Sequence, residues 1–386
     1  MVNNNNIFNN DNLIKNNNTN SKNKIDEAAT LKSLCHLYAD RLDQIQSGGG
    51  NASVKSIDDD LLYIKASGYL MSDVSTETGF SVLKLSEINA LLMNVKNGTI
   101  NLNDEALQNS RLSLANQTKL RPSIETYLHA MLSNRLVLHV HSFAAMLYAS
   151  SKDFNKRLVQ GELTATFSDA VLLVPYRKPG ISLALAMLEQ LEIYRTRFNC
   201  EPKWIVLQNH GLIIMGDSVE MIEQRNLEFE NLLLKAHATL ANIIKPYQLV
   251  TDIKKTLDQI DTLKANFVRY SGIQLPSTMK HIVFSFPDAV VFCGPEILYV
   301  DDENQINEML CTFFRENGEA PKVLILSNEI YVIGTDLRKL YELEDVLKIQ
   351  MKLNAILGDE IYGLDDTEIE ILTQWEAEKY RKKLKV

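Results

Sequence analysis

Cysteine is scarce in this sequence of 386 residues, which contains only Cys35, Cys200, Cys293 and Cys311. The four are widely spaced and form no Cys-x-x-Cys pair, so neither a disulfide framework nor a cysteine zinc site is predicted. Free cysteines are typical of a reducing compartment, and we therefore expect the protein to be cytoplasmic.

Long apolar runs and an excess of positive charge are also lacking. No run approaches the roughly 18 apolar residues of a membrane span, and the N-terminus lacks the apolar core of a signal peptide. Lysine and arginine number 40 against 49 aspartate and glutamate, a formal net charge of -9. This balance argues against a nucleic-acid-binding or membrane-binding surface, and we interpret the basic cluster from Lys379 to Lys385 as a solvated helix face.

The sequence predicts a tail and two domains. Twelve of the first 24 residues are asparagine, so we expect residues 1–24 to be a disordered tail. Residues 25–244 alternate between helical and strand patterns, which indicates an α/β layered domain. Residues 245–386 form a second, smaller α/β domain, which has no P-loop and no Gly-x-Gly-x-x-Gly motif after a strand.

Specific elements follow from periodicity. Helical spacing runs from Ala28 to Gln46, and the expected strands of the larger domain are 52–56, 61–66, 81–85, 136–141, 170–174, 204–208 and 212–215. The expected helices include 123–134, 142–150, 182–198, 218–244, 252–270, 336–357 and 366–384. Further apolar runs occur at 281–285, 289–292, 322–326 and 330–333.

Two histidines lie in the triplet His139-Val140-His141, at the end of an apolar run that predicts a buried strand. Side chains at i and i+2 of a strand share a face, so both imidazoles should point the same way. His210 follows a second apolar run, where a strand gives way to a turn at Gly211. Three imidazoles with an open fourth position are typical of a catalytic zinc site.

Glu125 follows Arg121-Pro-Ser-Ile, on the opening turn of a predicted helix, and could be a fourth ligand or a base beside the metal. Each piece alone has a simpler interpretation: a His-x-His pair can be packed in a core, and Asn-His-Gly can be only a turn. Their joint occurrence supports the metal site. We interpret the remaining histidines, namely His36, His129, His237 and His281, as structural or solvated, although His129 lies one helical turn after Glu125.

Six motifs resemble those of the class II aldolase/adducin superfamily, in order and in spacing. They are Gly48-Gly-Gly-Asn51-Ala-Ser53, Lys65-Ala-Ser67-Gly68, Arg121-Pro-Ser-Ile-Glu125, His139-Val-His141, Val174-Pro-Tyr-Arg-Lys-Pro-Gly180 and Gln208-Asn-His-Gly211. The resemblance covers roughly residues 28–240 and is closest to the aldolase portion of rhamnulose-1-phosphate aldolase/alcohol dehydrogenase fusion proteins. It implies a central, mainly antiparallel sheet flanked by helices.

The resemblance also implies roles for residues. His139, His141 and His210 would be the ligands of Zn²⁺ or another divalent transition metal, and Glu125 would be the catalytic acid/base. Gly50, Asn51, Ser67, Gly68 and Ser123 would bind the substrate's anionic group, partly through backbone amides. Taken alone, Gly48 to Gly50 would be interpreted as a helix stop. Phosphate-specific members have two adjacent serines before the glutamate, whereas this chain has Ser123 and Ile124.

The implied activity is that of a zinc-dependent lyase, which cleaves a ketose or ketose phosphate reversibly through a metal-stabilised enediolate. Its partners would be a small sugar or sugar phosphate and further copies of the chain in a homotetramer. Epimerisation, dehydration and decarboxylation on the same scaffold remain alternatives. So do a non-catalytic, adducin-like oligomeric scaffold and a split enzyme whose dehydrogenase is a separate chain. Tyr176 and Arg177 could line the pocket, but a packed strand end is the simpler interpretation.

Overall fold

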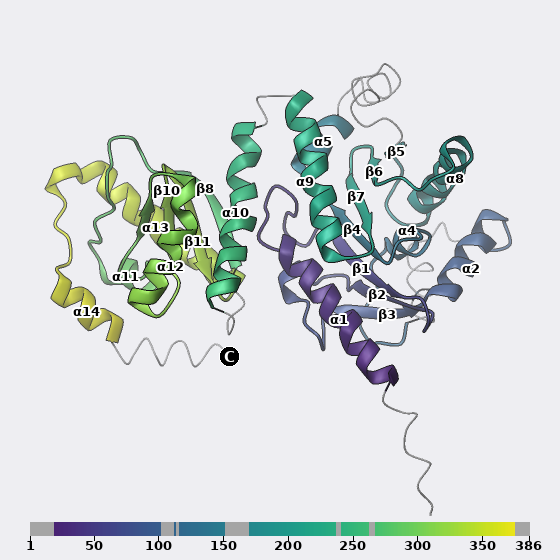
Figure 1. The fold of residues 1–386 in the computed structure, drawn as a ribbon, viewed down its shortest axis with the longest axis horizontal. Coiled ribbons are helices and arrows are strands. Elements are labelled where there is room, and N and C mark those ends of the chain that lie inside the picture. Colours follow the sequence, from purple (N-terminus) through teal and green to yellow (C-terminus); the bar gives the residue numbers. More distant parts are fainter. Residues whose placement is uncertain are drawn as a thin grey trace, which may run out of the picture. The chain divides into compact units, whose positions relative to one another are not determined.

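The computed structural model describes residues 19–101, 112, 116–150, 170–236, 241–261 and 267–374. The chain divides into two compact units, each with its own sheet (Figure 1). The first unit contains Met1–His36 and Ser47–Leu232, and the second contains Leu37–Gln46 and Leu233–Val386. No helix among the described residues is both long and apolar enough to cross a membrane.

The first unit is built on a seven-stranded sheet in the order β3-β2-β1-β4-β7-β6-β5. Neighbouring strands are antiparallel except β5 and β6, which are parallel. The expected mainly antiparallel sheet is therefore present. The strands are β1 (Asn51–Ser56), β2 (Leu61–Lys65), β3 (Phe80–Lys84), β4 (Leu136–Val140), β5 (Val171–Val174), β6 (Trp204–Leu207) and β7 (Gly211–Gly216).

Helices cover both faces of this sheet, because its central strands carry apolar side chains on both sides. On one face Ile205 and its neighbours form a core with α2 (Leu85–Lys96), α4 (Thr126–Ala130) and α8 (Ile181–Phe198). On the other face Trp204 contacts Phe229 of α9 (Val219–Ala236), with ring centroids 5.7 Å apart. The short helix α5 (Phe143–Ala149) follows β4. The result is the layered α/β domain that the sequence predicts.

The first helix differs at both ends from the prediction. Helix α1 spans Thr19–Tyr38, so residues 19–24 of the expected tail are helical, while residues 1–18 lie outside the described part. Once a helix has formed, each added residue contributes one more hydrogen bond, which favours such an extension. At the other end the helix stops before Gln46, because Asp40 and Arg41 make buried hydrogen bonds within the second unit.

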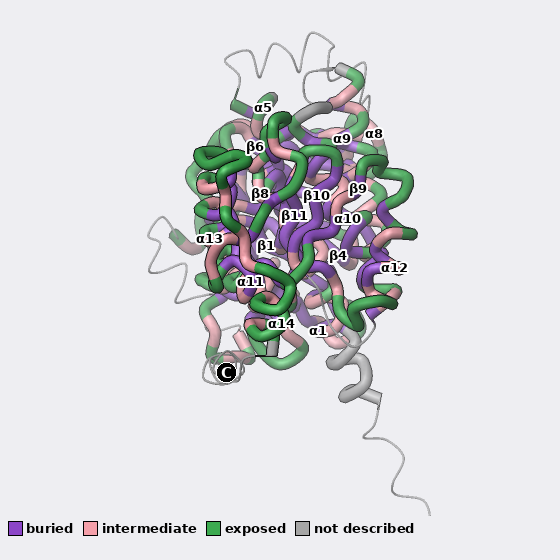
Figure 2. Tube along the Cα trace, turned by 90° about the vertical axis from the view of Figure 1, so that its left-hand side faces the viewer, coloured by how far each residue is buried: buried purple, intermediate pink, exposed green. Residues whose placement is uncertain are grey.

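The second unit contains a four-stranded sheet in the order β8-β11-β10-β9, with only β10 and β9 parallel. Its strands are β8 (Phe267–Gln274), β9 (Leu298–Val300), β10 (Val323–Leu326) and β11 (Glu329–Gly334). One face packs against α10 (Ala241–Ile260) and α12 (Ile306–Asn317). The other packs against α11 (Pro287–Cys293), α13 (Leu337–Leu357) and α14 (Asp366–Gln374). Figure 2 shows β10 and β11 buried between these layers.

One helix predicted for this unit was wrong at its C-terminal end. The helix expected over 252–270 ends at Ile260 as part of α10, and residues 267–270 begin strand β8. Phe267 and Val268 favour a strand, and pairing with β11 supplies the hydrogen bonds that a helix would otherwise make. By contrast, α13 confirms the helix predicted over 336–357, with Asp336 accepting a hydrogen bond from the Arg338 amide at its start.

The last predicted helix, over 366–384, is described only as far as Gln374, where α14 ends. The basic cluster from Lys379 to Lys385 lies outside the described residues, as does His237. The apolar run 289–292, for which the sequence indicated no particular element, is helical and lies in α11.

Candidate functional site

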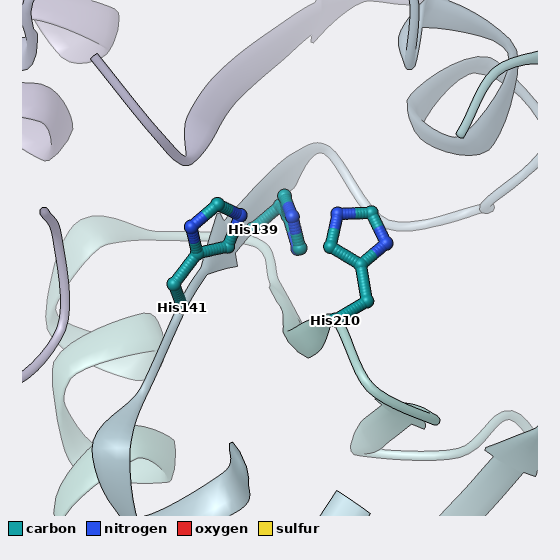
Figure 3. Close-up of side chains that lie close together, drawn as sticks. All are labelled: His139, His141 and His210. Carbon is teal, nitrogen blue, oxygen red and sulfur yellow. The ribbon is translucent and has the colours of Figure 1, made fainter. Parts of the chain in front are cut away.

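Three histidine rings converge at one edge of the first sheet (Figure 3). His139 lies in β4, His141 follows that strand, and His210 lies in the turn between β6 and β7. The ring centroids are 4.8 to 5.5 Å apart. One nitrogen of each ring can be chosen so that the three lie within 4.8 Å of one another, which could hold a metal ion. The two sequence patterns, which belong to separate strands, thus lie side by side in the fold.

Strand register explains why the three rings meet. Strand β4 pairs with β7, so that Val140 is opposite Leu212, and β7 begins at Gly211, next to His210. The turn that carries His210 is tight, and Asn209 adopts a positive φ of 53° within it. Asparagine tolerates this left-handed conformation better than most residues. The turn therefore places the third imidazole beside the end of β4.

The His139 ring is oriented by a hydrogen bond to the backbone. Its Nδ1 lies 3.2 Å from the carbonyl oxygen of Leu212. A carbonyl can only accept, so Nδ1 carries the proton and Nε2 keeps a lone pair. That Nε2 is buried and has no hydrogen-bond partner among the described residues. Burial also lowers the pKa of His139 to about 4, which keeps the ring neutral near pH 7. A neutral, oriented imidazole of this kind suits metal coordination.

Glu125 lies beside these histidines, immediately before α4. Its Oε1 is 3.1 Å from Nε2 of His210, and its Oε2 is 3.6 Å from Nε2 of His139. Burial raises the pKa of this carboxyl, but in acid, where His139 is protonated, the charge of that ring, together with His210 and the hydrogen bond from Asn51, outweighs burial and holds the pKa of Glu125 below the usual range. Glu125 is therefore a carboxylate at neutral pH, within reach of the same space as the imidazoles.

Among the residues predicted to bind an anion, Asn51 and Ser123 are hydrogen-bonded to Glu125. The Asn51 amide donates to Glu125 Oε2 at 2.6 Å and to Ser123 Oγ at 3.3 Å. Ser123 Oγ in turn accepts the backbone N–H of Glu125 at 3.2 Å. The structure thus joins the first motif and the 121–125 motif directly.

The glycines and Ser67 occupy the turns next to this group. Gly50 precedes β1 with a φ of 67°, and Gly68 has a φ of 85° in an exposed turn after β2. The backbone N–H of Ser67 donates to the carbonyl of Arg121 at 2.9 Å, which ties this turn to the 121–125 motif. Both turns are therefore connected to Glu125, the first through the neighbouring Asn51 and the second through the 121–125 motif.

Gly211 has a packing role that the sequence did not reveal. A Cβ atom at this position would lie 2.4 Å from the carbonyl oxygen of Val140 and 3.1 Å from Cε1 of His139. It would also approach Cδ2 of His141 at 3.3 Å. The sequence suggested only a turn glycine after His210. The absence of a side chain instead lets β7 approach both histidines closely.

His129, which the sequence left as structural, is fully buried on α4. Its Nδ1 is 2.8 Å from the hydroxyl of Ser53. Burial lowers the pKa of His129 to about 3, so the ring is neutral. The only feature of the sequence that related His129 to the candidate site is its spacing of one helical turn after Glu125.

The interpretation of Tyr176 as a packed strand end was wrong. Tyr176 follows β5 and is 52% exposed, with its backbone N–H bonded to Oε1 of Gln208. Arg177 is also exposed, and its guanidinium donates to the carbonyl of Tyr176. Both residues are therefore on the surface next to the turn that carries His210.

Comparison with known proteins identifies the class of this chain. The model of the class II aldolase and adducin N-terminal domain matches residues 30–235, more than half of the chain. The chain belongs to this family. The match contains every candidate metal, acid/base and anion-binding residue described above.

Individual relatives are more distant. The uncharacterized oxidoreductase YuxG of Bacillus subtilis (strain 168) is 27% identical over 189 residues, which is 47% of this chain and 25% of that protein. The chain thus matches only about a quarter of that relative's length. The N-terminal class II aldolase domain of a conserved protein from Thermoplasma acidophilum is 22% identical, with a TM-score of 0.44, covering 61% of this chain and 99% of that domain. L-fuculose-1-phosphate aldolase from Thermus thermophilus is 15% identical, with a TM-score of 0.34, covering 56% of this chain and 94% of that one.

Proposed function

We propose that the protein is a metal-dependent lyase that cleaves a ketose or ketose phosphate by a reversible aldol reaction. The observation that carries the proposal is the buried Glu125 carboxylate, which lies 3.1 Å from His210 in a group of three converging histidines. Membership of the class II aldolase and adducin family supports it. Assembly as a homotetramer in the cytoplasm is part of the proposal.

His139, His141 and His210 would hold the metal. Three imidazoles favour zinc, although other divalent transition metals accept the same ligands. The donor set fits, because Nε2 of His139 is buried with its lone pair free of hydrogen bonds from the described residues. When bound, the ion would supply Lewis-acid stabilisation of the negative charge that develops on a substrate oxygen.

Glu125 would move the proton. Its lowered pKa keeps it ionised at neutral pH, so it can accept a proton from a substrate hydroxyl within hydrogen-bonding distance. The same carboxyl would return the proton in the reverse, condensing direction. The Asn51 amide holds Oε2 in place, which limits the rotation of the carboxylate and leaves Oε1 on the side of His210.

The substrate's anionic group would bind at the turns of Gly50, Ser67 and Gly68, with Asn51 and Ser123 between those turns and Glu125. Turns that contain glycines with positive φ can direct successive backbone N–H groups at one anion. Ile124 offers no hydroxyl here, so backbone donors would bear more of the binding. A ketose with a phosphate and a ketose with a smaller anionic group are both compatible with this set of donors.

The experiment is an assay of aldehyde release from a panel of ketoses and ketose phosphates by the zinc-loaded protein. We expect release by the wild type and a fall of about 10² to 10⁴ in kcat for Glu125→Gln, the usual contribution of a general acid/base. Glu189→Gln, an exposed substitution on α8, is the matched control and should leave the rate unchanged.

Measurement of the zinc content distinguishes a residue that transfers the proton from a residue that binds the metal. Glu125→Gln should retain zinc, whereas His139→Asn should lose both zinc and activity. Conversion of a ketose or ketose phosphate without release of an aldehyde would instead indicate epimerisation, dehydration or decarboxylation. No reaction with any member, from protein that contains zinc, would overturn the proposal and favour the non-catalytic scaffold.

A further inference from the structure

A second buried hydrogen bond joins β1 to α4, beside the bond between Asn51 and Glu125. Nδ1 of His129 lies 2.8 Å from Oγ of Ser53, and both of these side chains are fully buried. Ser53 follows Asn51 by two positions on β1. His129 follows Glu125 by four positions, which is about one turn of a helix. Two side-chain hydrogen bonds therefore connect the same strand to the same short helix.

The spacing of the two bonds is similar on both elements. Side chains two positions apart on a strand share a face and are about 6.7 Å apart along it. Side chains four positions apart on a helix also share a face, and the rise between them is about 6 Å. Both bonds can therefore form without strain. A single bond would let α4 pivot about it, whereas two bonds at this separation also fix its direction.

Helix α4 depends on such contacts because it is short. It contains five residues, Thr126–Ala130, and one turn of helix is unstable without tertiary contacts. Tyr127 and Leu128 pack in the apolar core of the first unit. Apolar burial is non-directional, so it holds the helix in the core without specifying its orientation. The two hydrogen bonds supply that orientation.

Strand β1 also relates α4 to the candidate metal ligands. In the pairing of β1 with β4, Asn51 is opposite His139 and Ser53 is opposite Val137. The strand that is bonded to α4 is thus also bonded to the strand that carries His139. A shift of α4 along β1 would change the distance between Oε2 of Glu125 and Nε2 of His139, which is 3.6 Å.

The His129 ring is better suited to directing a bond than to filling space. Burial lowers the pKa of His129 to about 3, so the ring is neutral. Its Nε2 is buried without a hydrogen-bond partner among the described residues. Burial of such a polar atom is unfavourable, so an apolar side chain would pack here more favourably. The contribution of the imidazole is therefore its bond to Ser53.

We propose that Ser53 and His129 are positioning residues, which orient α4 so that Glu125 stays within reach of the three histidines and the substrate. Both are fully buried, so they act through α4 and do not touch the substrate. This role depends on the function proposed above for Glu125. Loss of the bond should therefore lower kcat and leave KM and the zinc content unchanged.

Two variants of similar shape test His129. His129→Leu removes the polar atoms, whereas His129→Asn puts an amide atom near the position of Nδ1, where it can donate to the Ser53 hydroxyl or accept from it. Leucine is the better helix former, so helix propensity favours the variant that we expect to be impaired. In the aldehyde-release assay we expect kcat to be about tenfold lower in His129→Leu and within about threefold of the wild type in His129→Asn.

Ser53→Ala removes the other half of the bond and should lower kcat by about tenfold as well. Because both substitutions break one bond, the double variant with His129→Leu should be no slower than either single variant. Tyr127→Phe is the matched control, since it removes from the same helix a buried hydroxyl that has no partner among the described residues. Its kcat should equal that of the wild type. Equal losses in the leucine and asparagine variants, or multiplied losses in the double variant, would overturn the proposal.

Hydrogen exchange tests the same bond without turnover. The backbone N–H groups of Leu128 and His129 donate to the carbonyl of Glu125 at 2.9 and 3.4 Å, and mass spectrometry can follow the peptide that contains them. We expect faster exchange in His129→Leu and Ser53→Ala than in the wild type, the asparagine variant and Tyr127→Phe. If the wild type cleaves no substrate, the function proposed for Glu125 fails, and faster exchange would still show that the pair holds α4. Exchange at the wild-type rate in both impaired variants would overturn the positioning role at any level of activity.

Discussion

The side-chain amide of Asn51 donates a hydrogen bond of 2.6 Å to Oε2 of Glu125, although the two residues are 74 positions apart in the chain. Asn51 opens β1, and Glu125 immediately precedes α4. The bond stabilises the charged form of the carboxylate in a buried setting, where charge is otherwise unfavourable. Asn51 thus has a role beside Glu125 in addition to the anion binding that the sequence suggested.

Substitution of Asn51 should therefore shift the pH dependence of the reaction. Loss of the donor in Asn51→Ala raises the pKa of Glu125, so the acidic limb of the kcat/KM profile moves to higher pH. Asn51→Asp adds a neighbouring carboxylate and should move the limb further. The measurement is kcat/KM against pH for the zinc-loaded variants. An acidic limb unchanged in both variants would show that Asn51 does not tune Glu125.

Local patterns predicted much of the fold and the candidate site. The period of two along β4 predicted that His139 and His141 share a face, and their ring centroids are 5.2 Å apart. The turn at His210 was also visible, because glycine follows an apolar run. These features depend only on residues that are neighbours in the chain, which is why they could be predicted from the sequence.

Features that depend on distant partners were not predictable in this way. Residues 267–270 have apolar spacing compatible with a helix, and pairing with β11, much later in the chain, makes them a strand. Asp40 lies beyond the end of α1 because it accepts the backbone N–H of Val268, which only the folded chain brings near. The close approach of Gly211 to His139 similarly follows from the β4–β7 register, which no local pattern specifies.

Gly211→Ala should disrupt the metal site. The new methyl group would lie 2.4 Å from the Val140 carbonyl oxygen, so β7 must move away from β4 and carry His210 with it. We expect zinc affinity to fall by about 10- to 100-fold, the range seen when groups that orient ligands are altered. Gly48→Ala is the control, because its Cβ would meet no atom within 4 Å. Zinc titration with a competing chelator measures both, and wild-type affinity in Gly211→Ala would contradict the prediction.

The cysteines should differ sharply in reactivity. Cys200 is exposed, whereas Cys35 and Cys293 are buried, and burial raises the pKa of each of these two thiols to about 12. Because the thiolate is the reactive form, iodoacetamide at pH 8 should modify Cys200 in the native protein and spare the two buried residues. Peptide mass spectrometry of protein treated before and after denaturation shows which of the three cysteines are modified in the native state. Modification of Cys35 at the rate of Cys200 would show that the core around α1 opens readily.

Lys55 should make the stability of the first unit depend on pH. Burial lowers the pKa of this lysine on β1 to about 7, against 10.5 when unperturbed, and Asp217 only partly opposes the shift. Between these two values the unfolded chain binds the proton that the folded chain has released, so the free energy of unfolding rises with pH. Lys55→Met should lose this rise, because methionine has no proton to release. Methionine is chosen because it fills similar space without charge. Urea unfolding followed by tryptophan fluorescence at pH 7 and pH 9.5 compares the two proteins. The same pH dependence in both would mean that Lys55 keeps its proton in the fold, held by Asp217 and the carbonyl of Asn134, to which its Nζ donates at 2.8 Å.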